Sequence, residues 1–270
     1  WFTKINFVLL TLRTAVGKNQ KAMNILLPTD FSEASQQALK YFENLSQNLD
    51  VQISVLNAYS ASNSPSRPFI AEGSHRKQAR KQVQKFVGKQ LLTSGKKVRY
   101  KAREGFPVQT ILEQSARYDL IVMSKNQSYA WAERWTGSRS YRVARQSHCP
   151  VLILPYAANF EDIKDIFPFG EVQGWQQHAV VQFLQGHWQA RIHTLADEST
   201  STKSTQVHEV KLTKFDELER FVQEAGIELL VLKLTNSWKE SNPFVSLSNS
   251  RVIHNLQLPV LAFNTRNLAQ

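Results

Sequence analysis

The sequence predicts an α/β fold of two tandem domains, each a parallel sheet flanked by helices. Two observations predict it. Short apolar segments alternate with helical patterns along the first half, and the second half repeats the first in shortened form. A chain of 270 residues is long enough for two cores. We place the first domain at residues 23–157 and the second at residues 158–270, after an extension at residues 1–22 that we expect to lie outside the native fold.

Five strands are expected in the first domain, because each is a short apolar run bounded by turn residues. They are Asn24–Pro28, Gln52–Ala58, Val98–Ala102, Leu120–Met123 and Val151–Leu154. Helical patterns fill the four intervals, at Ser32–Leu49, Ser74–Leu92, Pro107–Ala116 and Ser138–Gln146. The first helix carries an apolar face of Ala38, Leu39, Phe42 and Leu45, and Ser32 suits its N-cap. This alternation predicts βαβ units.

The repeat appears at two offsets. A shift of 140 residues places Ile25–Asp30 over Asp165–Gly170, and a shift of 109 places Tyr118–Val122 over Ile227–Val231. The difference between the offsets makes the second copy 31 residues shorter. The loss falls between its second and third strands, where Asp197–Thr205 forms a polar linker. We predict that the second copy lacks the basic helix that the first copy carries at this place.

Composition restricts the classes of partner. The net charge is +11, with basic clusters at Arg76–Lys81, Lys96–Lys101 and Arg134–Arg145. A solvated charged face explains such clusters more often than nucleic acid does, and no nucleic-acid-binding motif accompanies them, so we do not expect a nucleic acid partner. The first apolar run, Ile5–Leu12, is too short to span a membrane. The single cysteine, Cys149, is expected in the core of a cytoplasmic protein.

Enzymatic chemistry is not expected. The seven histidines show no metal-ligand spacing, and none lies near a candidate nucleophile. No catalytic triad, carboxylate pair or P-loop lysine is found in the sequence.

Several segments together resemble the universal stress protein family. They are Ile25–Ser35, the late strand ending in Met123, the Gly137-Ser138 pair and His148–Leu154. The resemblance covers residues 23–155 and, through the repeat, about residues 163–264. It implies two tandem universal-stress-protein-like domains of the adenine nucleotide alpha hydrolase-like type, each a five-stranded parallel sheet between helices, with the second domain degenerate.

Nucleotide-binding members of this family share a loop of a glycine, two residues, a second glycine, nine residues, and a glycine followed by serine or threonine. That spacing puts Ser124 and Gln127 at the first two glycines and Gly137-Ser138 at the last pair. Phosphate is held there by backbone N–H groups, which glycine allows to approach closely. Forcing a positive φ on Ser124 or Gln127 would cost about 1–2 kcal/mol each, so we expect weakened binding.

Other parts of such a site are present. The resemblance assigns the acid after the first strand to the adenosine part of the ligand, and Asp30 stands there beside Pro28 and Thr29. Charges and hydroxyls for phosphate are available from Lys125, Arg134, Arg139, Ser138 and Ser140. The candidate nucleotide residues are therefore Pro28, Thr29, Asp30, Met123, Ser124, Gln127, Gly137, Ser138, Arg139 and Ser140. In the second domain Gly170 replaces the acid, and no binding is expected.

The leading expectation is a non-enzymatic stress-response protein that regulates through an unidentified protein partner, with nucleotide binding weakened or lost. The two domains should pair inside one chain through Val151–Leu154 and Val260–Phe263, and a homodimer stays open. The aromatic loop segment Tyr129–Ala132 suits a contact surface. No cofactor is firmly expected. The alternatives are an ATP or adenine-nucleotide sensor in the first domain, and an anion-surface binder that uses Arg76–Arg103 and has a salt-dependent affinity for RNA or anionic lipid.

Overall fold

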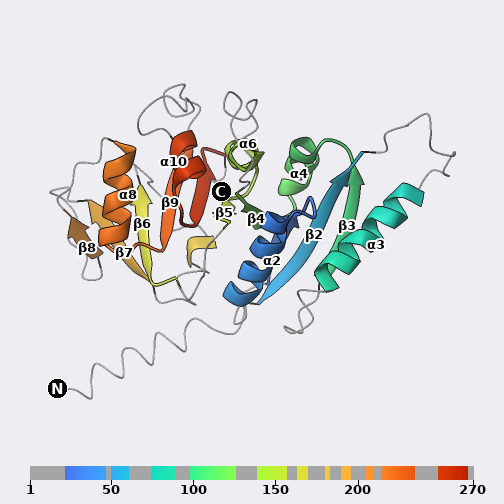
Figure 1. The fold of residues 1–270 in the computed structure, drawn as a ribbon, viewed down its shortest axis with the longest axis horizontal. Helices are drawn as coiled ribbons and strands as arrows, with labels where there is room; N and C mark the ends of the chain where they lie inside the picture. Colours follow the sequence, from blue (N-terminus) through green and yellow to red (C-terminus); the bar gives the residue numbers. More distant parts are fainter. Residues whose placement is uncertain are drawn as a thin grey trace, which may run out of the picture.

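The fold is known from a computed structural model (Figure 1). It describes residues 22–46, 50–60, 74–88, 98–125, 139–156, 163–169, 180–182, 190–195, 205–208, 214–234 and 249–266. The strands are β1 (Met23–Pro28), β2 (Val51–Tyr59), β3 (Val98–Glu104), β4 (Leu120–Ser124), β5 (Val151–Leu154), β6 (Asp165–Phe169), β7 (Arg191–Leu195), β8 (Thr205–His208), β9 (Leu229–Leu234) and β10 (Val260–Asn264). The helices are α2 (Glu33–Leu45), α3 (Ser74–Gly88), α4 (Pro107–Ser115), α6 (Arg139–Gln146), α8 (Phe215–Glu224) and α10 (Asn249–Asn255).

The strands form one sheet in the order β3-β2-β1-β4-β5-β10-β9-β6-β7-β8. Every described pair is parallel except β5 with β10, which is antiparallel. The second half repeats the strand order of the first in reverse, as expected for two copies of one unit related by an approximate two-fold axis. The predicted α/β class and the parallel sheet in each half are confirmed.

The expected strands of the first half are all present, with bounds that differ by one or two residues at some ends. The first helix is shorter than predicted, because it ends at Leu45 rather than Leu49. Ser46 caps it: its backbone N–H donates to Phe42 O, and its hydroxyl donates to Glu43 O at 3.2 Å. A serine hydroxyl that bonds to a nearby backbone carbonyl competes with the helical hydrogen-bond pattern.

Ser32 is the predicted N-cap, since its side chain accepts a hydrogen bond from the Ser35 backbone N–H at 3.3 Å. Residues 89–92, where the basic helix was expected to continue, lie outside the described residues. So do residues 1–21 and most of the polar linker before β8, and the absence of a helix there stays a prediction.

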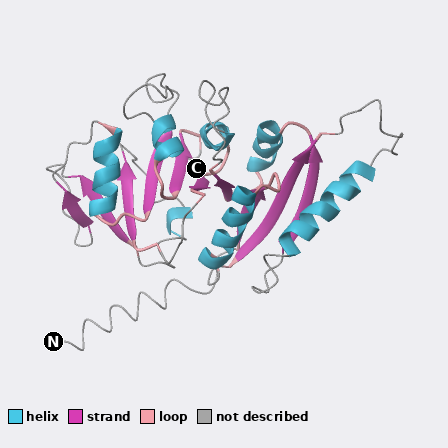
Figure 2. Cartoon of the chain, viewed as in Figure 1, coloured by secondary structure: helices cyan, strands magenta, loops and turns pink. Residues whose placement is uncertain are grey.

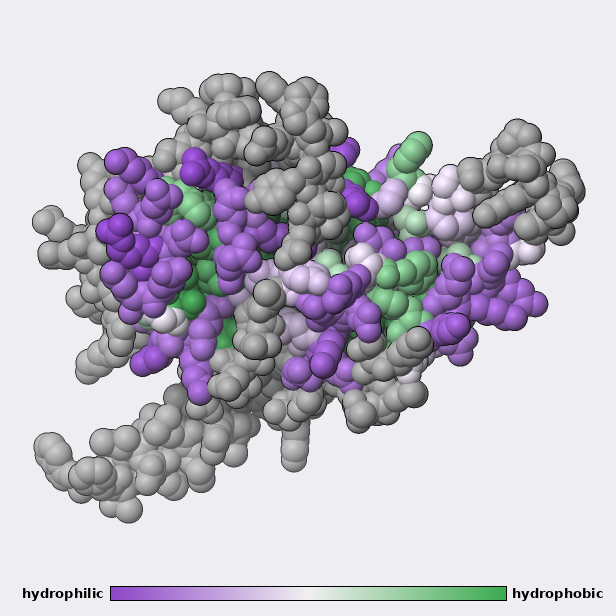
Figure 3. Space-filling model, in the orientation of Figure 1, coloured by the Kyte–Doolittle hydropathy of each residue, from purple (hydrophilic) through white to green (hydrophobic). Residues whose placement is uncertain are grey.

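Helices cover both faces of the sheet (Figure 2). Alternate strand residues point to opposite faces. One core cluster joins Ile25, Ile53 and Val122 to α2 and α3. The opposite cluster joins Leu26, Ile121 and Ile153 to α4, α6, α8 and α10. Cys149 is buried in this second cluster, as predicted. In the view of Figure 3 the outer surfaces of the helices are largely hydrophilic.

The antiparallel pair of β5 and β10 joins the two halves. Val260 lies opposite Ile153, Leu261 opposite Leu152, and Ala262 opposite Val151. All the side chains of both strands are buried. Each core cluster also contains residues from both halves, so the hydrophobic core runs through the seam without interruption. The predicted pairing of these two strands inside one chain is confirmed.

Two buried polar side chains complete the seam in different ways. Asn264, at the end of β10, donates 2.9 Å hydrogen bonds to Ala144 O and Ser147 O, at the end of α6. The 109-residue offset equates Asn264 with Pro155 and Ser147 with Leu256. Pro155 has no side-chain donor, so it cannot make the bond that Asn264 makes. The Lys125 Nζ donates to Leu256 O instead, at 3.1 Å. The last carbonyl groups of both helices thus find a donor from the other half.

Replacing Asn264 by alanine should destabilise the seam. The side chain is 2% exposed and makes two bonds to buried carbonyls, so Asn264→Ala should lower the free energy of unfolding by roughly 2–4 kcal/mol. Urea unfolding measures this change. Asn44→Ala, on the exposed face of α2, is the matched control and should change the free energy by less than about 0.5 kcal/mol. A loss below about 1 kcal/mol in Asn264→Ala would contradict the assigned role.

Lys125 should make stability rise at alkaline pH. Burial lowers the pKa of its ammonium to about 8 from an ordinary value of 10.5. The folded state therefore releases this proton before the unfolded state does. The cost of burying the charge is fully present below pH 8 and is relieved between pH 8 and 10.5, by up to about 3 kcal/mol. Unfolding of wild type and Lys125→Met across this range tests it: the rise should be absent from the variant, and an equal rise in both would rule out Lys125 as its source.

Candidate functional site

The candidate site lies where β1 and β4 diverge. These strands are neighbours in the sheet, but the chain leaves β1 through α2 on one face and leaves β4 toward α6 on the other. Such a switch point opens a crevice outside the carboxyl ends of the strands, where open α/β sheets bind their ligands. A pocket lies at this crevice, and its lining includes the ends of β1, β2 and β4 and the starts of α4 and α6.

The turn from β1 to α2 holds Asp30 at the edge of the pocket. Thr29 Oγ1 accepts the Phe31 backbone N–H at 3.0 Å, and Asn57 of β2 donates to Thr29 O at 2.8 Å. Phe31 takes a left-handed backbone with φ of 64°, a conformation that costs a non-glycine residue about 1–2 kcal/mol. Its ring packs edge-on against Phe86 of α3, with 5.5 Å between centroids, which helps to hold the turn.

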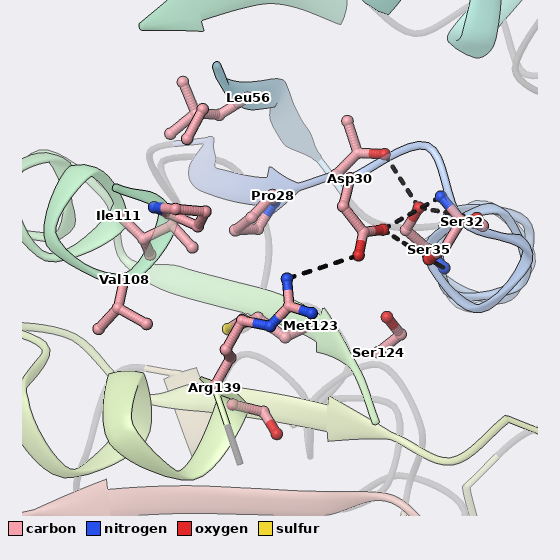
Figure 4. A pocket seen from close by; sticks show the side chains of 14 residues that line it. Pro28, Asp30, Ser32, Ser35, Leu56, Val108, Ile111, Met123, Ser124 and Arg139 are labelled. Atoms are coloured by element: carbon pink, nitrogen blue, oxygen red, sulfur yellow. Dashed lines mark hydrogen bonds and ion pairs between the residues drawn. The ribbon is translucent and has the colours of Figure 1, made fainter. Parts of the chain in front are cut away.

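The carboxylate of Asp30 accepts hydrogen bonds from the Ser32 hydroxyl and from the Ser32 backbone N–H at 3.1 Å. Across the pocket, Arg139 places a guanidinium nitrogen 3.7 Å from Asp30 Oδ2 (Figure 4). Burial alone would raise the pKa of the Asp30 carboxyl, but the Ser32 bonds and the Arg139 charge outweigh it, so this pKa lies below its ordinary value. Asp30 is therefore ionised at neutral pH.

The pocket combines an apolar wall with a polar rim. Figure 4 shows Val108 and Ile111 of α4 near Pro28 and Leu56, on the side of the pocket away from Ser32 and Ser35. Met123 and Ser124 line it from the end of β4, and Arg139 and Ser140 line it from α6. An apolar wall beside a few polar groups is typical of sites for flat organic ligands. The cavity volume is about 80 Å³, which is less than such ligands need.

The structure brings together seven of the ten candidate residues. Pro28, Thr29, Asp30, Met123, Ser124, Arg139 and Ser140 all line this pocket. Gln127, Gly137 and Ser138 lie outside the described residues, as do Arg134 and the aromatic segment Tyr129–Ala132. Ser124 still belongs to β4, where it pairs with Leu154, and among the described non-glycine residues only Phe31 has a positive φ. The strain expected at Ser124 is therefore not present in this conformation.

The expected role of Lys125 in attracting phosphate is wrong. Its side chain is 8% exposed and donates to Leu256 O in the second half, so it serves the seam. Side chains of consecutive residues in an extended segment point to opposite sides, and with Ser124 lining the pocket Lys125 turns away from it.

Sequence reasoning also missed the apolar wall of Leu56, Val108 and Ile111. Only their position in the predicted elements could have indicated them. They lie toward the end of β2 and in the first turns of α4, close to the carboxyl edge of the sheet.

A second group of charged residues lies in the other half of the sheet, separated from the crevice by β5, β10 and β9. Asp165, at the start of β6, accepts hydrogen bonds from His193 Nε2 at 2.6 Å and from an Arg191 guanidinium nitrogen at 2.7 Å. Burial alone would raise the pKa of Asp165, but these two partners hold it below its ordinary value. The group ties β6 to β7 at their amino ends, away from the crevice. Gly170, which replaces the acid in the second half, lies outside the described residues.

No group of three or more metal-binding side chains occurs in the described part of the chain. Over the same residues, no helix is long and apolar enough to cross a membrane.

Comparison with known proteins agrees with this geometry. The pattern described as "Universal stress protein family" matches residues 21–155, which is half of the chain. The chain belongs to the universal stress protein family. A universal stress protein of Methanocaldococcus jannaschii is 29% identical over 165 residues, which cover 55% of this chain and 94% of that protein.

Solved structures extend the family fold to both halves. A universal stress protein from Archaeoglobus fulgidus matches with a TM-score of 0.70 at 18% identity, covering 90% of this chain and 96% of its own. A functionally unknown protein from Pseudomonas aeruginosa matches with a TM-score of 0.59 at 13% identity, covering 96% and 95%. These likenesses confirm the tandem fold of the universal stress protein.

The Ser32 hydroxyl should control both Asp30 and α2. Ser32→Ala removes a hydrogen bond to the carboxylate and the N-cap, so the pKa of Asp30 should rise toward its ordinary value and the protein should lose about 1 kcal/mol of stability. In wild type, the stabilisation from ionised Asp30 is present at neutral pH and is lost as the pH falls through the lowered pKa. Carboxyl NMR titration and urea unfolding measure the two effects. An unchanged Asp30 pKa would show that Ser32 does not set it.

Proposed function

We propose that this universal stress protein is a non-enzymatic stress-response regulator whose first half binds the adenosine part of an adenine nucleotide weakly. The observation that carries the proposal is the position of Asp30, an ionised acceptor at the crevice between β1 and β4, facing an apolar wall. Sugar hydroxyls suit a carboxylate acceptor, and a flat base suits the wall of Val108 and Ile111.

Three features support weak rather than tight binding. The cavity of about 80 Å³ must widen before a nucleoside enters. Arg139 pairs with Asp30 across the pocket, so a ligand has to compete for this carboxylate. On the phosphate side, Ser124 and Gln127 replace glycines and Lys125 points to the seam. We infer that the phosphates add little to the affinity and that the signal passes on through protein contacts.

A second candidate is regulation through protein contacts with no nucleotide at all. The same Asp30–Arg139 ion pair favours it, because a closed pair would fill the site with the protein's own charges. The first candidate predicts saturable binding of adenosine-containing ligands in a calorimetric titration. The second predicts no binding.

Calorimetric titration with AMP, ADP and ATP, with and without magnesium, tests the proposal. We expect saturable binding weaker than about 100 μM, with similar affinities for the three ligands because the phosphates contribute little. Asp30→Ala should weaken it by at least about tenfold, since a charged hydrogen-bond partner is lost. Glu33→Ala removes a neighbouring exposed carboxylate that does not line the pocket and should leave binding unchanged.

Two results would overturn it. Absence of heat at millimolar ligand would leave regulation through protein contacts alone. ATP binding much tighter than AMP binding would mean that the loop still holds phosphate despite its lost glycines.

A further inference from the structure

An aromatic side chain is exposed next to the apolar wall of the pocket. Phe106 is 80% exposed, and among the described residues the only other exposed large hydrophobic side chain is Phe31, at 36%. Phe106 directly precedes α4, and the next two residues, Pro107 and Val108, line the pocket. Single exposed apolar residues are common on protein surfaces, so the exposure of Phe106 by itself indicates no function.

The sequence around Phe106 keeps this residue out of the helix. Proline disfavours a helical backbone in the residue before it, and Phe106, which precedes Pro107, is extended with φ of -72° and ψ of 134°. The residue before it, Gly105, has a φ of +138°, and a Cβ there would lie 2.8 Å from Thr110 Oγ1. The backbone that carries the ring is therefore a defined turn and not a frayed helix end.

The second half has the same residue in a buried position. The 109-residue offset equates Phe106 with Phe215 and Pro107 with Asp216. Without a proline after it, Phe215 is the first residue of α8, where its side chain is 6% exposed and belongs to the core. The guanidinium carbon of Arg251, on α10, lies 5.5 Å from the centre of this ring. The ring of Phe215 thus connects α8 with α10.

The corresponding place in the first half is the pocket. By the same offset α4 corresponds to α8 and α6 to α10, and the starts of α4 and α6 both line the pocket. The second half places a phenylalanine ring between its two helices, whereas the first half has a cavity there and keeps the equivalent ring in solvent. The cation is repeated too, because Arg142 on α6 is exposed and corresponds to Arg251.

We propose that Phe106 covers an adenine base bound in the pocket, with its ring stacked on the face of the base that points away from Val108 and Ile111. This inference rests on the function proposed above and adds a contact to it. The cavity of about 80 Å³ is too small to bury a nucleoside, so a second apolar face is needed to cover the base. A change of the χ1 rotamer moves the ring while the backbone stays in place, and exposed side chains make such changes within nanoseconds.

Calorimetric titration of the full chain with AMP tests the contact. Phe106→Ala should bind AMP at least about fivefold more weakly than wild type, because the stacking of the base on an aromatic ring is lost. It should keep the melting temperature of wild type, since the side chain is exposed. Gln109→Ala is the matched control, because it removes an exposed side chain of α4 that does not line the pocket, and it should bind like wild type.

Fluorine NMR observes the ring directly. With 4-fluorophenylalanine at position 106 alone, the resonance should shift saturably over the AMP concentrations at which calorimetry shows binding, because a stacked base changes the environment of the ring. Ribose 5-phosphate, which has no base, should leave the resonance unchanged.

The possible results separate this inference from the proposed function. If AMP binds equally well to wild type and Phe106→Ala, or if the fluorine resonance does not move at saturating AMP, the pocket binds the nucleotide but Phe106 does not cover the base. Equal losses in Phe106→Ala and Gln109→Ala would also overturn the inference, because they would assign the effect to α4 as a whole. If millimolar AMP does not bind to wild type, the proposed function is wrong and the inference is wrong with it.

Discussion

The antiparallel contact between β5 and β10 is the interaction on which the rest of the structure depends. Each strand is short and, apart from Asn264, apolar, and without the other it would expose an edge whose backbone groups lack partners. Paired, they turn two five-stranded sheets into one and allow both core clusters to cross the seam. Helices α6 and α10 then end beside the opposite half, where Asn264 and Lys125 meet their last carbonyl groups.

The pocket depends on the same framework. β1 and β4 are neighbours in the parallel sheet, and the crevice between their ends follows from the strand order. Within it, Thr29, Asn57 and Ser32 fix a strained turn, so Asp30 is set in place before any ligand arrives. The side of the pocket that we propose for a base is thus built on described strands and helices, whereas Gln127, Gly137 and Ser138, which the resemblance assigns to phosphate, lie outside the described residues.

Much of this could be predicted from the sequence, and the reason is local. Alternating apolar runs such as Ile25–Leu27 and Leu120–Met123 carry their strand signal in their own residues, and the repeat carries the order of the second half. Seven of the pocket residues were found through the resemblance to the universal stress protein family, whose acid position and loop spacing fall on this part of the sequence. The features that could not be predicted depend on the direction of a side chain and on contacts between residues far apart in the sequence. The position of Lys125 in the sequence suggests a phosphate ligand, but the extended backbone directs its side chain away from the pocket. Val108 and Ile111 form the apolar wall only because α4 packs over β2.

The unequal solutions at the seam have an evolutionary consequence. In a symmetric dimer of identical chains, each residue of the interface occurs twice, once in each chain. A substitution therefore changes both of its copies at once. Here Asn264 serves one helix end, while on the other side the equivalent position is Pro155 and Lys125 takes over the task. Joining the copies in one polypeptide has removed that constraint. One copy can then lose a helix or a binding loop, provided that it still offers β10 to its neighbour.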